Sequence, residues 1–155
     1  MKIQSIKTNN HRRAFEIGTR LQPFLFPYSK ARPSPGTDDP VVETSIDKEL
    51  GREAFYFKLA SGKEGIVHIE QVLEYNQDPG YLRDLLLYKL TLAAQKGVER
   101  SKLSKREIIR RLGTSPAQFY RLLDATNYRK SVDKVLFLLH VLDCEVDLVV
   151  RGRST

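Results

Sequence analysis

The chain has 155 residues, of which 41% are hydrophobic, and a formal net charge of +7 at neutral pH. This length allows one ordinary domain or two small ones, and the apolar content is enough for a soluble core. A single cysteine excludes an internal disulfide, and no apolar run is long enough to cross a bilayer. No apolar secretory segment follows Met1, so we expect a cytoplasmic protein that does not enter a membrane.

The positive charge lies in the second half of the chain. Residues 1–78 contain 11 Lys and Arg against 11 Asp and Glu, whereas residues 79–155 contain 15 against 8. Between Arg100 and Lys130, nine basic residues are opposed only by Glu107 and Asp124. This local excess is the footprint expected for a polyanion partner, although a solvated helix surface can carry the same kind of charge run.

The first half is predicted to form short strands joined by turns. The proline-rich stretch 31–40 should be a loop, and residues 70–75 a short helical turn. Phe55 and Phe57 should point to one face of their strand and Tyr56 to the other. Aromatic and β-branched residues favour strands over residues 3–7, 14–20, 21–28, 41–46, 54–59 and 65–69.

A domain boundary is predicted near Asp78 and Pro79, which suit the N-cap and the first position of a helix. It separates a β-rich domain, residues 1–77, from a helical domain, residues 78–151. We expect the β-rich domain to sense a signal, to dimerise or to bind a partner. Helical periodicity then predicts an apolar stripe, wide enough for contacts on more than one side, formed by Leu82, Leu85, Leu86, Leu90 and Ala93 and widened by Leu87, Tyr88 and Leu92.

Three shorter helices are predicted next, each starting at a serine. Residues 104–107 and 115–118 have the capping-box pattern, in which the acid or amide three residues after the serine reaches back to it. Ser131 would cap a third helix over residues 132–142. Gly113 lies between the first two helices, where a left-handed backbone would end one helix and turn the chain sharply into the next.

The turn at Gly113 predicts which side chains of these two helices face inward. Helical spacing places Ile108, Ile109 and Leu112 inside from the first helix, and Phe119, Leu122 and Leu123 from the second. The outward residues of the second helix are then Ser115, Pro116, Ala117, Gln118, Tyr120, Arg121 and Asp124.

With its glycine turn and proline-started second helix, the stretch 105–123 resembles the helix-turn-helix of the lambda-repressor/Cro (XRE-like) family. The resemblance covers about residues 81–142. It departs at Ile109, where the family usually has a small residue, and at Thr114, where it usually has an apolar one. Residues 135–150 resemble the last helix and strand of antitoxin-type members, and the first half resembles a small β-rich bacterial domain of uncharacterised role.

The fold class is therefore predicted as α+β. A small antiparallel β domain would be followed by an all-α helix-turn-helix bundle that ends in a β-strand. That strand, residues 145–150, would pair with the N-terminal sheet or with its own copy across a two-fold axis. Because the helix 132–142 is apolar almost all round, it also favours a further interface, and together these features indicate a homodimer.

The resemblance implies that the second short helix enters the major groove of DNA. Arg121 can bond guanine and Gln118 adenine, each in a bidentate way. Gln118 could instead only complete its capping box, and Tyr120 could be a packing residue. The base-reading candidates are Ser115, Ala117, Gln118, Tyr120 and Arg121. The phosphate-contacting candidates, which would set the register on DNA, are Lys105, Arg106, Arg110, Thr114, Asn127, Arg129, Lys130 and Ser131.

These features favour a sequence-specific transcriptional regulator, a dimeric repressor bound to double-stranded DNA at a palindromic operator. A second hypothesis is an antitoxin that represses its own operon and masks a toxin through the N-terminal domain. A third is a protein-interaction adaptor that does not bind DNA. Because no catalytic, metal-ligand or cofactor motif occurs in the sequence, we expect no enzyme activity, no metal and no cofactor.

Overall fold

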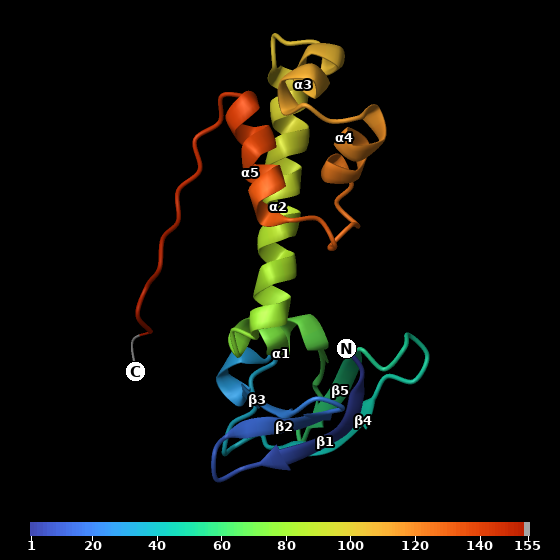
Figure 1. Cartoon of the computed structure of the whole chain (residues 1–155). Coiled ribbons are helices and arrows are strands. Elements are labelled where there is room, and N and C mark those ends of the chain that lie inside the picture. Colours follow the sequence, from blue (N-terminus) through green and yellow to red (C-terminus); the bar gives the residue numbers. More distant parts are fainter. Residues whose placement is uncertain (154–155) are drawn as a thin grey trace. The chain divides into compact units, whose positions relative to one another are not determined.

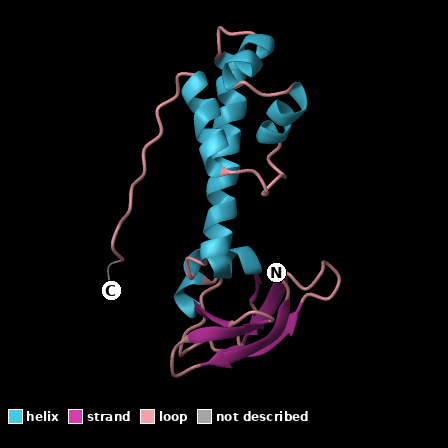
Figure 2. Cartoon of the chain, viewed as in Figure 1, coloured by secondary structure: helices cyan, strands magenta, loops and turns pink. Residues whose placement is uncertain are grey.

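The computed structural model describes residues 1–153 and divides the chain into two compact units (Figure 1). The first unit comprises Met1–Leu82 and the second begins at Arg83. Over the described residues the chain forms two three-stranded antiparallel sheets and five α-helices, so the fold is mixed α+β (Figure 2). Both sheets lie in the first unit, and helices α3, α4 and α5 lie in the second.

The first unit contains the strands that the sequence predicts, shifted by a few residues at their ends. One sheet has the order β1-β2-β3 and the other the order β4-β5-β6, and all neighbouring strands are antiparallel. The strands are β1 (Ile3–Asn9), β2 (Ala14–Thr19), β3 (Pro23–Pro27), β4 (Val41–Ile46), β5 (Ala54–Leu59) and β6 (Glu64–His68), with a 3-10 turn η1 (Tyr28–Lys30) after β3.

Aromatic side chains form the centre of the first core. The ring of Phe15 lies 4.9 Å from that of Tyr28, 5.0 Å from Phe55 and 5.2 Å from Phe57, measured between centroids. Phe55 and Phe57 are buried while Tyr56 between them is 42% exposed, which confirms the predicted alternation. Gly65 of β6 is required here, because a Cβ atom would overlap the ring of Phe57.

Helix α1 (Ile69–Tyr75) closes the first core, and α2 (Pro79–Arg100) carries the chain onward. The predicted start of α2 is confirmed, since the Asp78 Oδ2 accepts a hydrogen bond from the backbone N–H of Tyr81 at 3.0 Å. Tyr81 packs against the first core. The first turn of α2 therefore belongs to the first unit, and the division falls inside this helix rather than before it.

The apolar stripe of α2 differs from the prediction. The fully buried positions are Leu87, Thr91 and Ala94, whereas Leu86 is 49% exposed and Ala93 is also exposed. The spacing of the leucines alone does not identify the buried face, because Thr91 lies in the core and Leu86 does not. Thr91 is tolerated in the core because its hydroxyl donates a hydrogen bond to the Leu87 carbonyl oxygen at 2.6 Å.

The second core forms where α3 (Lys105–Leu112), α4 (Pro116–Leu123) and α5 (Val132–Val141) pack together with α2. Ile108 and Phe119 are completely buried and Leu122 nearly so, while Ile109, Leu112 and Leu123 are partly buried against the same core. The predicted inward faces are thus confirmed. From α5, the core receives Val135, Leu138 and Leu139.

The helix starts follow the predicted serines, but the capping is simpler than expected. The Ser104 hydroxyl accepts from the Glu107 N–H at 3.1 Å, and the Ser115 hydroxyl from the Gln118 N–H at 3.2 Å. The reciprocal half of each box is not among the hydrogen bonds of the described residues. Ser131 precedes α5 without a side-chain capping bond to that helix.

The predicted C-terminal strand does not form within the described chain. Residues 145–153 leave α5 as an extended segment that pairs with no strand among the described residues (Figure 1). Alternating apolar side chains alone do not make a strand, because its backbone needs a hydrogen-bonded neighbour. Val146 is 48% exposed, Leu148 73% and Val150 84%.

Over residues 1–153, no helix has the length and apolar character needed to span a bilayer.

Candidate nucleic-acid interface

The turn between α3 and α4 is built on Gly113. Its φ of +65° and ψ of 34° are left-handed, and its N–H bonds the Arg110 carbonyl oxygen at 3.0 Å. A Cβ atom at this position would meet nothing within 4 Å. The backbone conformation, not space, therefore requires glycine here. After it, Ser115 caps α4, and the turn holds the two short helices on one core.

One face of α4 is free of the core. The helical period places Ala117, Tyr120 and Arg121 opposite the buried side chains of Phe119 and Leu122, and all three are exposed. The Tyr120 ring is 53% exposed and lies edge-on to the Phe119 ring, with centroids 5.3 Å apart. Tyr120 thus packs against Phe119 and leaves about half of its surface open to solvent.

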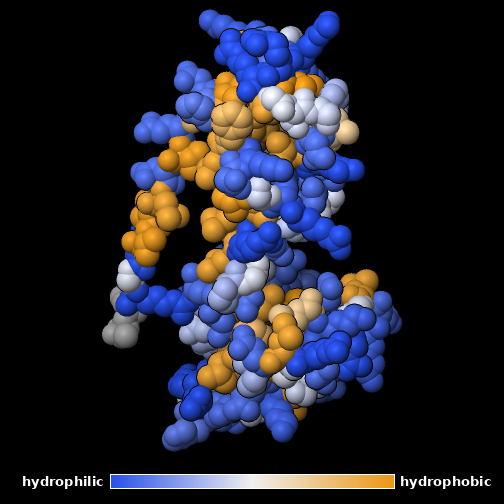
Figure 3. All heavy atoms as spheres, in the orientation of Figure 1, coloured by the Kyte–Doolittle hydropathy of each residue, from blue (hydrophilic) through white to orange (hydrophobic). Residues whose placement is uncertain are grey.

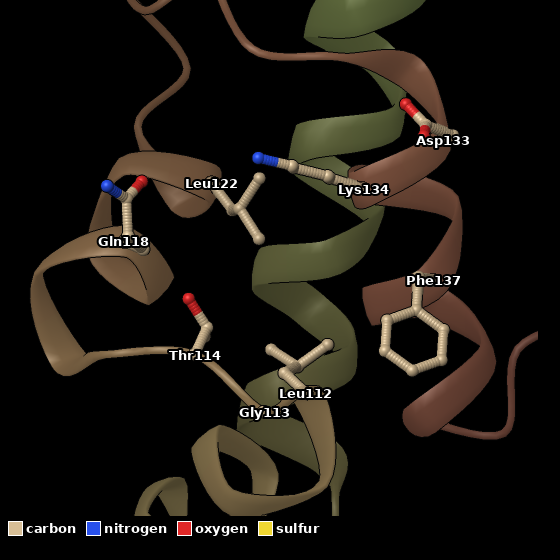
Figure 4. Close-up of a pocket in the computed structure, with 8 residues that line it drawn as sticks. All are labelled: Leu112, Gly113, Thr114, Gln118, Leu122, Asp133, Lys134 and Phe137. Carbon is tan, nitrogen blue, oxygen red and sulfur yellow. The ribbon is translucent and has the colours of Figure 1, made fainter.

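Gln118 lies on the flank of α4 rather than on this outward face. With Thr114 from the turn, it lines a hollow of about 430 Å³ between the start of α4 and α5 (Figure 4). Lys134 and Phe137 of α5 line the other side of the hollow. Gln118 is itself exposed and lies one helical turn before Arg121, so the hollow borders the predicted base-reading surface on the side of α5.

The start of α3 carries exposed positive charge. Lys105 and Arg106 occupy its first two positions, and both are exposed. Hydrophilic residues cover this end of the second unit (Figure 3). Positive side chains at a helix N-terminus add to the positive end of the helix dipole, and Glu107 in the same turn offsets part of this charge.

Arg110 is engaged in an ion pair within α3. Its Nε donates to Glu107 Oε2 at 2.9 Å, and its Nη2 donates to Oε1 at 2.5 Å. Arg111 Nε also donates to Oε1, at 3.1 Å. The hydrogen bonds from Arg110 and Arg111 lower the pKa of Glu107 from 4.5 to about 2. One carboxylate thus offsets part of the charge of two arginines that face solvent.

Lys130 is not an exposed phosphate contact, contrary to the prediction. Its side chain is only 7% exposed, and its Nζ donates to the carbonyl oxygens of Leu122 at 3.0 Å and Asp124 at 2.8 Å. Burial lowers the pKa of Lys130, and the nearby charge of Asp124 opposes this effect. The ammonium group faces the C-terminal end of α4 because that end presents carbonyl oxygens without helical partners.

The loop between α4 and α5 is held by short side-chain bonds. Asp124 Oδ1 accepts from the N–H and the hydroxyl of Thr126 at 2.9 and 2.7 Å, and Asn127 Oδ1 accepts from the Arg129 N–H at 3.1 Å. The Asn127 amide also donates to the Arg121 carbonyl oxygen at 3.4 Å. Asn127 is thus occupied locally, whereas Arg129 and Ser131 are exposed.

Two residues of α2 hydrogen-bond the end of α4 and the loop that follows it. Gln95 Nε2 donates to the Leu123 carbonyl oxygen at 2.7 Å, and Arg83 Nη1 donates to the Tyr128 carbonyl oxygen at 3.1 Å. The sequence contains no local signal for either hydrogen bond, because the partners lie far away along the chain.

Among residues 1–153, no three His, Cys, Asp or Glu side chains gather as a metal site would require.

Comparison with models of protein families, with curated proteins and with solved structures finds no match to this chain.

Proposed function

We propose that the second unit binds double-stranded DNA in a sequence-specific way and that the protein is a transcriptional regulator. The observation that carries this proposal is the exposed face of α4, with Ala117, Tyr120 and Arg121, together with the exposed basic side chains at the start of α3 in the same unit. The helix is held from behind by its own core, which leaves its outward side chains free for a partner.

An α-helix with its side chains is about 10–12 Å across, and the major groove of B-DNA is about 12 Å wide. In the proposed complex α4 lies in this groove. Arg121 donates two hydrogen bonds to a guanine edge, and Tyr120 contacts a thymine methyl group or a phosphate. Ser115 and Ala117 lie close to the bases because the first turn of such a helix approaches the groove most closely.

The phosphate contacts come from side chains on either side of α4. Lys105 and Arg106 at the start of α3 face one stretch of backbone, and Arg129 and Ser131 before α5 face another. These groups are exposed and supply charge without reading bases. Arg110 contributes less, since its guanidinium is already bonded to Glu107.

The proposed regulator acts as a homodimer. The face of α5 that points away from the core exposes Val132, Leu136 and Phe137, by 41%, 37% and 47%. The extended segment after Cys144 adds exposed valine and leucine side chains. A second copy would cover apolar surface of this kind, and a two-fold dimer matches the two half-sites of a palindromic operator.

The test is a selection of bound duplexes from a random-sequence library, followed by affinity measurements over a range of salt concentrations. We expect enrichment of one palindromic sequence. We also expect its affinity to fall linearly on a log–log plot, with a slope of about −0.9 for each phosphate contact. If no sequence is enriched and no duplex binds in a salt-dependent way, the proposal is wrong and the adaptor hypothesis is favoured.

A further inference from the structure

The C-terminal end of α4 is held by side chains from outside the helix. The last carbonyl oxygens of a helix have no partner within it and must find one elsewhere. Here Gln95 of α2 donates to the Leu123 carbonyl oxygen at 2.7 Å. Lys130 donates to those of Leu122 and Asp124 at 3.0 and 2.8 Å.

A third side chain completes this arrangement. The Asn127 amide donates to the Arg121 carbonyl oxygen at 3.4 Å, and the same oxygen accepts the Asp124 N–H at 3.3 Å. Four consecutive carbonyl oxygens at the end of α4 thus have partners. The donors are three side chains that all lie outside α4, namely Gln95, Asn127 and Lys130.

The direction of α4 depends on such contacts because the helix is short. It has eight residues, and an isolated helix of that length is unstable in water. Gln95, which lies 28 residues before Leu123 in the chain, ties the end of α4 to α2. Lys130 adds a positive charge at the negative end of the helix dipole and is buried there.

We propose that Gln95, Asn127 and Lys130 form a clamp that sets the direction of α4 and so aligns Arg121 with the base edges. We call these three residues the α4 clamp. This inference rests on the proposed function, since alignment matters only if α4 reads DNA. The clamp residues are positioning residues that touch the helix backbone and not the DNA.

The neighbouring residues Arg129 and Lys130 allow a matched test. Arg129 is exposed and Lys130 is 7% exposed, so replacing either by methionine removes one positive charge from a different place. The probes are the duplex enriched by the wild-type protein from a random-sequence library and a scrambled duplex of the same length. Affinity for both is measured between low and moderate salt.

For Lys130→Met, we expect the ratio of affinities for selected and scrambled duplex to fall about tenfold, the size of one misaligned base contact, at an unchanged salt slope. For Arg129→Met, both affinities should fall together and the slope should become shallower by about 0.9. A Lys130→Met protein that behaves like Arg129→Met would overturn the inference, because Lys130 would then be a phosphate contact.

Gln95→Met provides a second variant that leaves the charge of the protein unchanged. It removes the hydrogen bond from the Gln95 amide to the Leu123 carbonyl oxygen. It should lower the ratio of affinities for selected and scrambled duplex without altering the salt slope. Thermal unfolding followed by circular dichroism reports whether each variant still folds. If both clamp variants are unfolded, or both fold and keep the wild-type ratio, the clamp inference is wrong. If the wild-type protein enriches no sequence, the proposed function itself fails.

Discussion

The Glu107 carboxylate and the Arg110 guanidinium lie one helical turn apart on α3 and form two hydrogen bonds, at 2.9 and 2.5 Å. Arg111 shares the same carboxylate at 3.1 Å. This carboxylate lies in the most basic stretch of the chain and offsets part of its charge. It therefore bears directly on how strongly the region attracts a polyanion.

Glu107→Gln should increase the attraction for DNA of any sequence. The change removes one negative charge and frees two guanidinium groups that face solvent. We expect tighter binding of a scrambled duplex at low salt, with a salt slope steeper by up to about 0.9. The control is Glu64→Gln, which removes an exposed carboxylate from the first unit. Unchanged affinity in Glu107→Gln would show that α3 does not approach the DNA.

The same ion pair predicts an unusual titration. Because Arg110 and Arg111 hydrogen-bond the carboxylate, the pKa of Glu107 lies at about 2 instead of 4.5. A lowered pKa means that the pairing is fully present above pH 4.5 and is lost as the pH falls towards 2. Carbon-detected NMR of the Glu107 carboxylate should give a midpoint near the lower value. In Arg110→Ala the midpoint should rise; a midpoint that stays the same would contradict the pairing.

Arg121→Ala should lower the discrimination between DNA sequences more than Gln118→Ala. Arg121 lies on the outward face of α4, whereas Gln118 lines the hollow beside α5. Loss of a bidentate arginine contact is worth about 1–3 kcal/mol of discrimination. The measurement is the affinity of each variant for the selected duplex and for single-base variants of it. A larger loss from Gln118→Ala would mean that a different face of α4 reads the bases.

Gly113→Ala should destabilise the second unit by about 1–2 kcal/mol, because alanine must then adopt a left-handed backbone. The φ of +65° is the only obstacle, since a Cβ atom at Gly113 meets nothing within 4 Å. Gly36→Ala is the control: its Cβ also meets nothing within 4 Å, and no positive φ is required there. Chemical denaturation measures the free energy of unfolding of both variants. Equal stability of the two variants would contradict the strained turn.

Several parts of this protein could be predicted from sequence because they depend on neighbouring residues. The alternation of Phe55, Tyr56 and Phe57 follows from the two-residue period of a strand, and the structure has it. Ser104 and Ser115 start their helices because a hydroxyl can accept a nearby backbone N–H. Each of these features depends on side chains within a few positions of one another.

Other features arise only when distant segments meet. In the sequence, Lys130 is one more basic residue in a charged stretch. In the folded chain it is buried against the end of α4. Gln95 has no visible role until Leu123 is brought to it. Residues 145–150 alternate like a strand but have no neighbour in the described chain to pair with.

Local sequence thus determined strands β1 to β6, the helix starts and the glycine turn, because each depends on residues that are close together in the chain. Tertiary structure decided which polar side chains are free to meet a partner. A carbonyl oxygen at a helix end that lacks a helical partner accepts a hydrogen bond from a donor that the fold brings near. The sequence alone does not show which donor this is. For this reason Arg129 stays exposed at the surface, while its neighbour Lys130 holds a helix from within.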